Sequence, residues 1–262
     1  MREDPDETLA LLADLVGATD ERLRELAKRL AAKVFVDIAR GARDASRGVG
    51  LLRTLAYQPD GGDLDIDASL EGMRVAAHNG GHTVDPDLLR VRGWVHPRTA
   101  LCLLVDRSGS MEGKPLATAA LAAAAVASLA PSDYSVLAFG RDVVVSKGQL
   151  SQKPSERVVG DLLSLRGFGT TDLASALVAA RSQLDRSGAG RKIAVLLSDC
   201  RATVAGNAAA VAAGLDELVI VAPESDCEGA IAFAAGIGAK CLTVSGPSVV
   251  AEVLTRALSR SL

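Results

Sequence analysis

The stretch TALCLLVDRSGSMEGKP, residues 99–115, decides the fold class of this 262-residue chain. It begins with a largely apolar run that ends in the carboxylate of Asp106, and a tight turn with Gly109 follows. An alanine-rich stretch with helical character comes directly after the turn. A buried strand that turns at once into a helix is the repeating unit of a parallel α/β sheet.

The same rhythm continues towards the C-terminus. Further short apolar runs occur as DYSVLAFG, KIAVLLSD, ELVIVAP and KCLTVSG, and helices are expected at 115–130, 172–186, 206–214, 227–237 and 248–261. FGRDVVVSK indicates one hairpin, so one edge strand should be antiparallel. The sequence therefore predicts a doubly wound α/β fold, Rossmann-like, with a mostly parallel sheet and helices on both faces.

Residues 1–97 are expected to form a small helical and hairpin region that precedes a domain at 98–262. An amphipathic helix should begin after Thr19 or Asp20 and end near Gly41, and its apolar stripe comprises Leu23, Leu26, Ala27, Leu30, Val34 and Ile38. A turn signal at 59–62 predicts a hairpin, followed by a short helix.

Two metal-binding patterns in this region are incomplete. Asp63, Asp65 and Asp67 lack the glycine and the final glutamate of a calcium loop, so we expect an exposed acidic strand face. His78 and His82 have helical spacing, but two glycines between them argue against the helix that a metal-binding pair would need.

The composition excludes several classes of function. The 29 basic and 32 acidic side chains nearly cancel, and aromatic residues are scarce, so nucleic acid is not expected as a partner. The acidic start lacks the features of a secretory signal, and no apolar run is long enough for a membrane span, which favours the cytoplasm. The cysteines are scattered without zinc spacing, so reduced and mostly buried thiols are expected.

Oxygen-bearing side chains follow three of the predicted elements. Asp106, Ser108 and Ser110 end the first strand of the series, Asp199 ends KIAVLLSD, and the loop GFGTTDLASAL supplies Thr170 or Thr171. The carboxyl ends of parallel strands meet at one edge of a sheet, where ligands bind. Carboxylate and hydroxyl oxygens suit a hard divalent cation, Mg²⁺ or alternatively Mn²⁺. Asp172, at a helix start, is better explained as an N-cap.

This pattern resembles the metal-ion-dependent adhesion site of von Willebrand factor A (VWA) domains. The resemblance implies that Ser108, Ser110 and Thr171 contact the metal directly, while Asp106 and Asp199 hold it directly or through water. Cys200 stands where that family commonly has glycine. The region upstream resembles that of bacterial CoxE-like proteins, which are associated with MoxR-type AAA+ ATPases.

The resemblance implies binding rather than catalysis. We expect a metal-dependent protein-binding module, an adaptor or co-chaperone of a MoxR-type ATPase, whose partner supplies an Asp or Glu to the metal. A non-catalytic subunit of a metal-chelatase-like ATPase complex is the alternative. A haloacid dehalogenase-type phosphatase would need a second aspartate where Ser108 stands, and nucleotide-binding glycine motifs are missing. Cys200 has no histidine nearby in sequence to activate it, so a packing role is favoured.

Overall fold

The computed structural model describes residues 4–17, 21–45, 51–57, 63–78, 86–95, 99–107, 114–165 and 169–258. It divides into two compact units, residues 1–47 with 99–262, and residues 48–98. The region 1–97 expected from the sequence is thus shared between both units.

The larger unit is built on a six-stranded sheet in its described part, with strand order β6-β5-β4-β7-β8-β9. The strands are β4 (Thr99–Asp106), β5 (Tyr134–Phe139), β6 (Val143–Lys147), β7 (Arg191–Leu197), β8 (Glu217–Pro223) and β9 (Lys240–Val244). Every neighbouring pair is parallel except β5 and β6. The predicted sheet, including its antiparallel edge strand, is confirmed.

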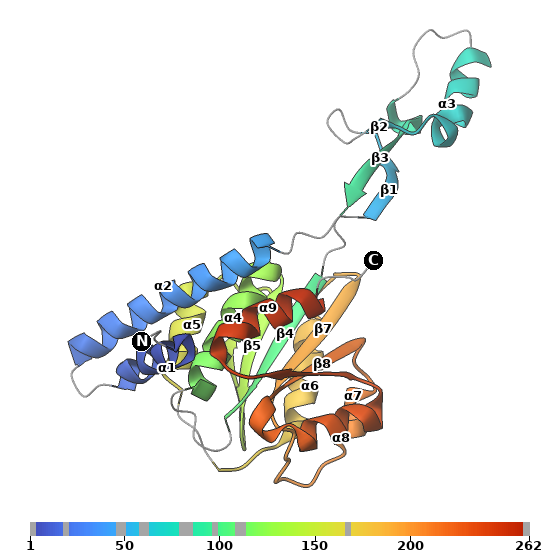
Figure 1. Cartoon of the computed structure of the whole chain (residues 1–262). Coiled ribbons are helices and arrows are strands. Elements are labelled where there is room, and N and C mark those ends of the chain that lie inside the picture. Colours follow the sequence, from blue (N-terminus) through green and yellow to red (C-terminus); the bar gives the residue numbers. More distant parts are fainter. Residues whose placement is uncertain are drawn as a thin grey trace. The chain divides into compact units, whose positions relative to one another are not determined.

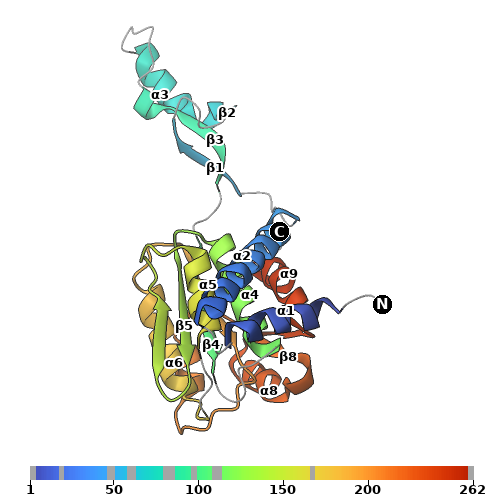
Figure 2. The same ribbon diagram turned by 90° about the vertical axis from the view of Figure 1, so that its left-hand side faces the viewer.

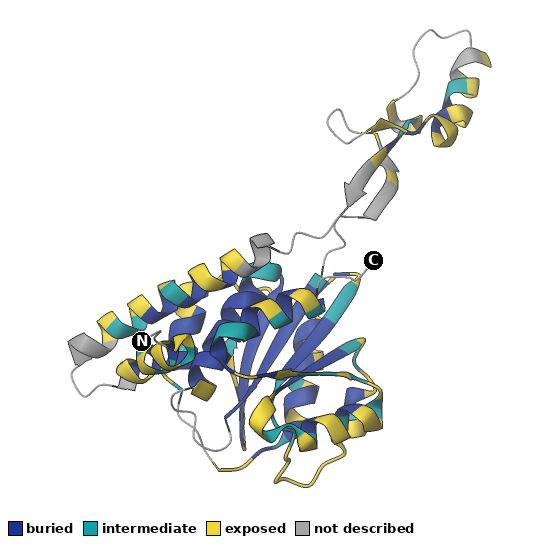
Figure 3. Ribbon diagram, viewed as in Figure 1, coloured by how far each residue is buried: buried dark blue, intermediate teal, exposed yellow. Residues whose placement is uncertain are grey.

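Helices cover both faces of this sheet (Figures 1 and 2). One face carries α1 (Pro5–Asp14), α2 (Glu21–Ala45), α4 (Lys114–Leu129), α5 (Ser155–Leu163) and α9 (Pro247–Leu258). The other carries α6 (Leu173–Leu184), α7 (Ala208–Ala212) and α8 (Glu228–Ile237). Alternate residues of the central strands β4, β5, β7 and β8 contribute to the two cores, and these four strands are buried through their centres (Figure 3). The sequence analysis missed α5.

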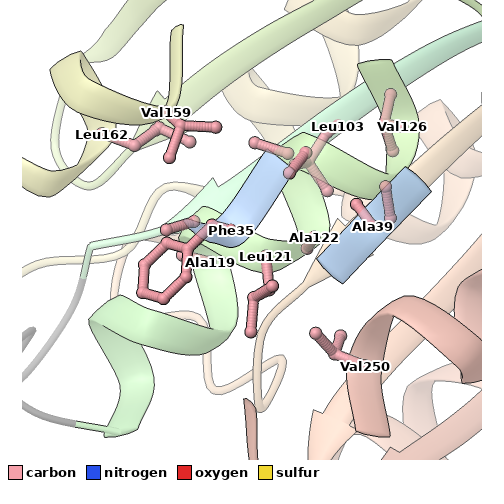
Figure 4. Packing of buried hydrophobic residues seen from close by; sticks show 14 of the residues in the cluster. Phe35, Ala39, Leu103, Ala119, Leu121, Ala122, Val126, Val159, Leu162 and Val250 are labelled. Atoms are coloured by element: carbon pink, nitrogen blue, oxygen red, sulfur yellow. The ribbon is translucent and has the colours of Figure 1, made fainter. Parts of the chain in front are cut away.

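The N-terminal helices belong to the sheet's core. Phe35 and Ala39 of α2 are buried against alanine-rich α4, whose small side chains let the two helices approach closely (Figure 4). Asp6 of α1 accepts a hydrogen bond from the backbone N–H of Ser248 at the start of α9, with N to Oδ1 at 2.8 Å. The helix α2 continues past Gly41 to Ala45, and its expected N-cap positions lie outside the described residues.

The smaller unit contains β1 (Leu51–Ala56), β2 (Asp63–Leu64), α3 (Ile66–His78), a 3-10 turn η2 (Pro86–Leu88) and β3 (Arg90–Val95). The predicted hairpin between β1 and β2 is wrong, because both strands pair antiparallel with β3, which the sequence analysis missed. β3 lies between β1 and β2 in the sheet and pairs with both, so β1 and β2 are not neighbours.

The prediction that Asp65 lies on an exposed strand face is also wrong. Asp65 is buried and caps α3 by accepting from the N–H of Ala68 at 3.1 Å. It also accepts from the Thr54 hydroxyl at 2.9 Å and from Arg92 Nε at 3.1 Å. These hydrogen bonds, the one from Ala68 foremost, lower the pKa of Asp65. Asp63 and Asp67 are exposed, as expected.

The histidine and cysteine predictions have different outcomes. His78 ends α3, whereas His82 and His96 lie outside the described residues. All four cysteines lie in the described segments, and each is a free thiol. Only Cys102 is buried, so the expectation of mostly buried thiols is wrong. Within the described helices, none combines the length and apolar character that crossing a membrane requires.

Candidate metal centre

The centre of the sheet brings two of the predicted carboxylates to the same edge. Strands β4 and β7 are parallel neighbours, with Val105 opposite Leu197. Asp106 therefore ends β4 beside the point where the chain leaves β7 towards Asp199. Asp106 is 9% exposed and Asp199 is half-buried. Ser108 and Ser110, predicted as ligands, lie outside the described residues.

Ser198, which the sequence analysis did not single out, connects the two strand ends. Its hydroxyl donates to Asp106 Oδ2 at 2.5 Å and accepts from the backbone N–H of Cys200 at 2.9 Å. The first bond orients the Asp106 carboxylate, and the second shapes the turn after β7. The signal in the sequence was a serine directly before the strand-end aspartate, in LLSD.

The turn at 199–201 contains Cys200, at the position where VWA domains commonly have glycine. Asp199 Oδ1 accepts from the backbone N–H of Arg201 at 2.9 Å, and Cys200 has a φ of 61°, in the left-handed region. Glycine adopts this region without a steric penalty, whereas other residues pay for it. Cys200 thus has the backbone conformation that glycine favours.

The Cys200 thiol is not activated. Burial, followed by the negative charge of Asp199, raises its pKa to about 12. It packs against the core on the α6 side of the sheet. A thiol that stays protonated at neutral pH is a poor nucleophile, which supports the packing role expected from the sequence.

The threonine loop is fixed by its backbone. Thr171 N–H donates to Thr203 Oγ1 at 2.7 Å, and the carbonyl of Thr171 accepts from the N–H groups of Thr203 and Val204 at 3.1 and 3.2 Å. The N–H of Asp172 donates to the carbonyl of Gly140 at 2.8 Å. Gly140 follows β5, the other neighbour of β4, so the loop is hydrogen-bonded to segments on both sides of Asp106.

The two candidate threonines differ in environment. Thr170 is exposed, whereas Thr171 is fully buried and its Oγ1 has no hydrogen-bond partner among the described residues. A buried hydroxyl without a partner costs about 1–3 kcal/mol, and native proteins rarely keep one unless something else occupies the position. A hard cation is a ligand that such an oxygen fits.

Asp172 has the structural role that was expected. It is the N-cap of α6, where Oδ1 accepts from the Ser175 N–H at 3.0 Å and Oδ2 from the Ser175 hydroxyl at 2.7 Å. These bonds lower its pKa, with the backbone bond as the largest cause. Asp172 is next to Thr171 in sequence, but both of its carboxylate oxygens accept hydrogen bonds from Ser175 in α6.

The donor set fits a divalent cation better than a softer metal. Within the described part of the chain, no three His, Cys, Asp or Glu side chains gather as a potential metal site. Cysteine and histidine ligation is therefore not indicated there. Two carboxylates and one buried hydroxyl supply only oxygen, which Mg²⁺ and Mn²⁺ accept.

Several solved structures are similar to this chain. The D319A mutant of the PilB minor pilin from Streptococcus sanguinis is 12% identical, with a TM-score of 0.50 over 65% of this chain and 64% of that one. At this identity the likeness concerns the fold alone. The von Willebrand factor type A protein from Catenulispora acidiphila is 16% identical with a TM-score of 0.48 over 64% of this chain, which spans 43% of that protein. BatB from Bacteroides thetaiotaomicron is 16% identical, with a TM-score of 0.46. The match covers 62% of this chain and 97% of the BatB chain.

A family comparison is more specific. The sequence has no match among curated proteins. Residues 26–251 match the family model described as VWA domain containing CoxE-like protein. This match begins within α2, covers the smaller unit and ends within α9, so it spans most of the chain. The chain therefore belongs to the CoxE-like family of VWA domain proteins.

Proposed function

We propose that this protein is a metal-dependent protein-binding module and not an enzyme. Asp106, Ser108, Ser110, Thr171 and Asp199 would hold Mg²⁺ or Mn²⁺ at the carboxyl edge of the sheet. The observation that carries the proposal is the buried Thr171 hydroxyl, which lacks a partner among the described residues, in a loop hydrogen-bonded to the segments after β5 and β7. Ser198, bonded to Asp106, would keep that carboxylate in position.

The charge at the centre suits an acidic partner. Asp106 and Asp199 together offset the two positive charges of a divalent cation, and the hydroxyls are neutral. The bound cation would supply a Lewis-acidic position that accepts a carboxylate oxygen from another protein. Loss of such a contact, if it is a binding hot spot, would cost roughly 2–4 kcal/mol, which is about 30- to 1,000-fold in affinity.

The family supports a particular class of partner. The resemblance to CoxE-like proteins implies an association with MoxR-type AAA+ ATPases. We therefore propose that this chain acts as an adaptor or co-chaperone for such an ATPase during assembly or maturation of other proteins. The acidic residue would be supplied by the ATPase or by a client bound to it. Nucleotide turnover would belong to the ATPase.

The test is a titration of the purified chain against a purified MoxR-type ATPase from the same organism, in Mg²⁺ and in chelator. We expect association in Mg²⁺ and a loss of at least 30-fold in chelator. Asp106→Asn removes one carboxylate charge with little change in shape and should cause the same loss. Replacing the contacting Asp or Glu of the ATPase by Asn or Gln should weaken the association by about the same factor.

Asp172→Asn is the matched control, because it removes a neighbouring charge while asparagine still caps α6. This variant should bind like the wild type. Association that ignores the chelator, or an Asp106→Asn variant that binds as tightly as the wild type, would show that the metal is not the contact.

A further inference from the structure

A cavity adjoins the candidate metal centre. It has a volume of 370 Å³ and lies at the carboxyl ends of β4, β7, β8 and β9, beside the first turn of α4. Such a volume is within the range of about 300–1,000 Å³ typical of ligand pockets. Its lining residues are Val105, Asp106, Lys114, Pro115, Thr118, Ala119, Leu197, Ser198, Asp199, Pro223, Ser225, Val244, Ser245 and Gly246.

The wall of this cavity has a polar part and an apolar part. Asp106, Ser198 and Asp199 form a polar part, which is also the described part of the metal centre. Aliphatic side chains and prolines form most of the remainder, including the buried Val244 and Ala119. A ligand that fits both parts must carry a polar head and an apolar body.

The charged residues that line the cavity determine whether the polar head of the ligand is anionic or cationic. Lys114, exposed at the start of α4, lines the cavity together with the two aspartates. Without a cation the carboxylates outnumber the lysine and repel an anion. With a divalent cation the sum becomes one positive charge, which favours an anionic head.

We propose that the cavity receives a large apolar side chain of the partner protein, adjacent in sequence to the Asp or Glu that binds the metal. This inference rests on the proposed function and specifies what the partner must carry. The acidic residue gives metal dependence, and the neighbouring side chain gives affinity and selectivity. An apolar anchor in a pocket beside a charged contact is the usual composition of a binding hot spot.

Three blocked peptides test the proposal: acetyl-Gly-Asp-Gly-amide, acetyl-Phe-Asp-Gly-amide and acetyl-Gly-Asp-Phe-amide. Their affinities for the full chain can be measured by ligand-observed NMR in Mg²⁺ and in chelator. Full burial of a phenylalanine side chain corresponds to about 10- to 100-fold in affinity. We expect at least one phenylalanine peptide to bind 10-fold or more tightly than the glycine peptide in Mg²⁺.

Three substitutions test whether the gain in affinity from phenylalanine comes from the cavity. Ser225→Phe adds a ring at an exposed position of the cavity lining, so it should occupy the space and abolish the advantage of the phenylalanine peptides. Ser182→Phe adds the same ring at an exposed position of α6 outside the lining and should change nothing. Ala119→Leu fills the cavity from its buried wall and should act like Ser225→Phe, with folding checked by circular dichroism.

The outcomes separate the two proposals. If the glycine peptide binds only in Mg²⁺ but phenylalanine adds nothing, the pocket proposal is overturned and the proposed function stands. If no peptide depends on Mg²⁺, the metal-dependent function itself fails. An advantage of phenylalanine that persists in chelator, or that Ser225→Phe leaves intact, also overturns the coupling between cavity and metal.

Discussion

Replacing Thr171 by valine should stabilise the metal-free chain and reduce the further stabilisation that metal gives. Valine has nearly the shape of threonine but no hydroxyl. The Thr171 side chain is fully buried, and its Oγ1 has no hydrogen-bond partner in the described structure. Without metal, the wild type therefore bears the cost of a desolvated hydroxyl, about 1–3 kcal/mol. Thr171→Val removes that cost.

The magnitudes make the effect measurable. A change of 1 kcal/mol shifts Tm by about 2–4 °C in a chain of this size, so Thr171→Val should melt about 2–12 °C higher than the wild type in chelator. At Mg²⁺ a hundredfold above Kd, the wild type should gain about 2.7 kcal/mol. The variant should gain much less, because one of its ligands is gone.

Calorimetric or fluorescence melting in chelator and in Mg²⁺ is the assay. Thr170→Val is the control: Thr170 is exposed, so its replacement should change stability by no more than about 0.5 kcal/mol and keep the full gain from Mg²⁺. The reasoning is refuted if Thr171→Val is less stable than the wild type in chelator, or if it keeps the whole gain from Mg²⁺.

Three further predictions concern other parts of the larger unit. Asp6→Ala should lower the free energy of unfolding by about 1 kcal/mol, because Ser248 at the start of α9 loses its cap; a variant that melts like the wild type would contradict this. Burial lowers the pKa of Lys147, whose Nζ donates to the carbonyl of Tyr134, to about 8 from 10.5. The unfolded chain thus binds more protons between these values, so urea unfolding should show stability rising from about pH 8 to 10.5 relative to Lys147→Met; parallel profiles would count against it. Cys200→Val should destabilise more than Cys200→Gly, because a β-branched residue is strained at a φ of 61°, and equal melting temperatures would disprove this.

The sheet could be predicted from the sequence because its central strands are buried on both faces. Such strands read as short apolar runs, and each run is followed by a turn and, in most cases, a helix. β6 was recognisable from its hairpin with β5. The helix α5 escaped because it follows the antiparallel edge strand, where the strand and helix rhythm is interrupted.

The smaller unit was harder to predict for a physical reason. Strand pairing there depends on β3, which lies far along the chain from β1 and has an arginine-rich pattern without a long apolar run. The burial of Asp65 is equally non-local, because Thr54 and Arg92 from other strands supply its partners. Periodicity along one segment contains no information about such contacts.

The candidate centre was only partly accessible from sequence. The positions of Asp106 and Asp199 at strand ends made both of them candidates in the sequence. The hydrogen bond from Ser198 to Asp106 depends on strand register, which cannot be read from the sequence. The resemblance favoured Thr171 over Thr170, and the burial of Thr171 supports that choice. The assignment of the five ligands stays a prediction.

A titration with Mn²⁺, followed by electron paramagnetic resonance of the free ion, tests the metal centre most directly. Wild-type protein and Asp172→Asn should each bind one Mn²⁺ per chain at this site, in competition with Mg²⁺. Asp106→Asn should lose this binding while its circular dichroism spectrum remains that of the folded protein. Wild-type protein that binds no Mn²⁺, or an Asp106→Asn variant that binds it with unchanged affinity, would contradict the account.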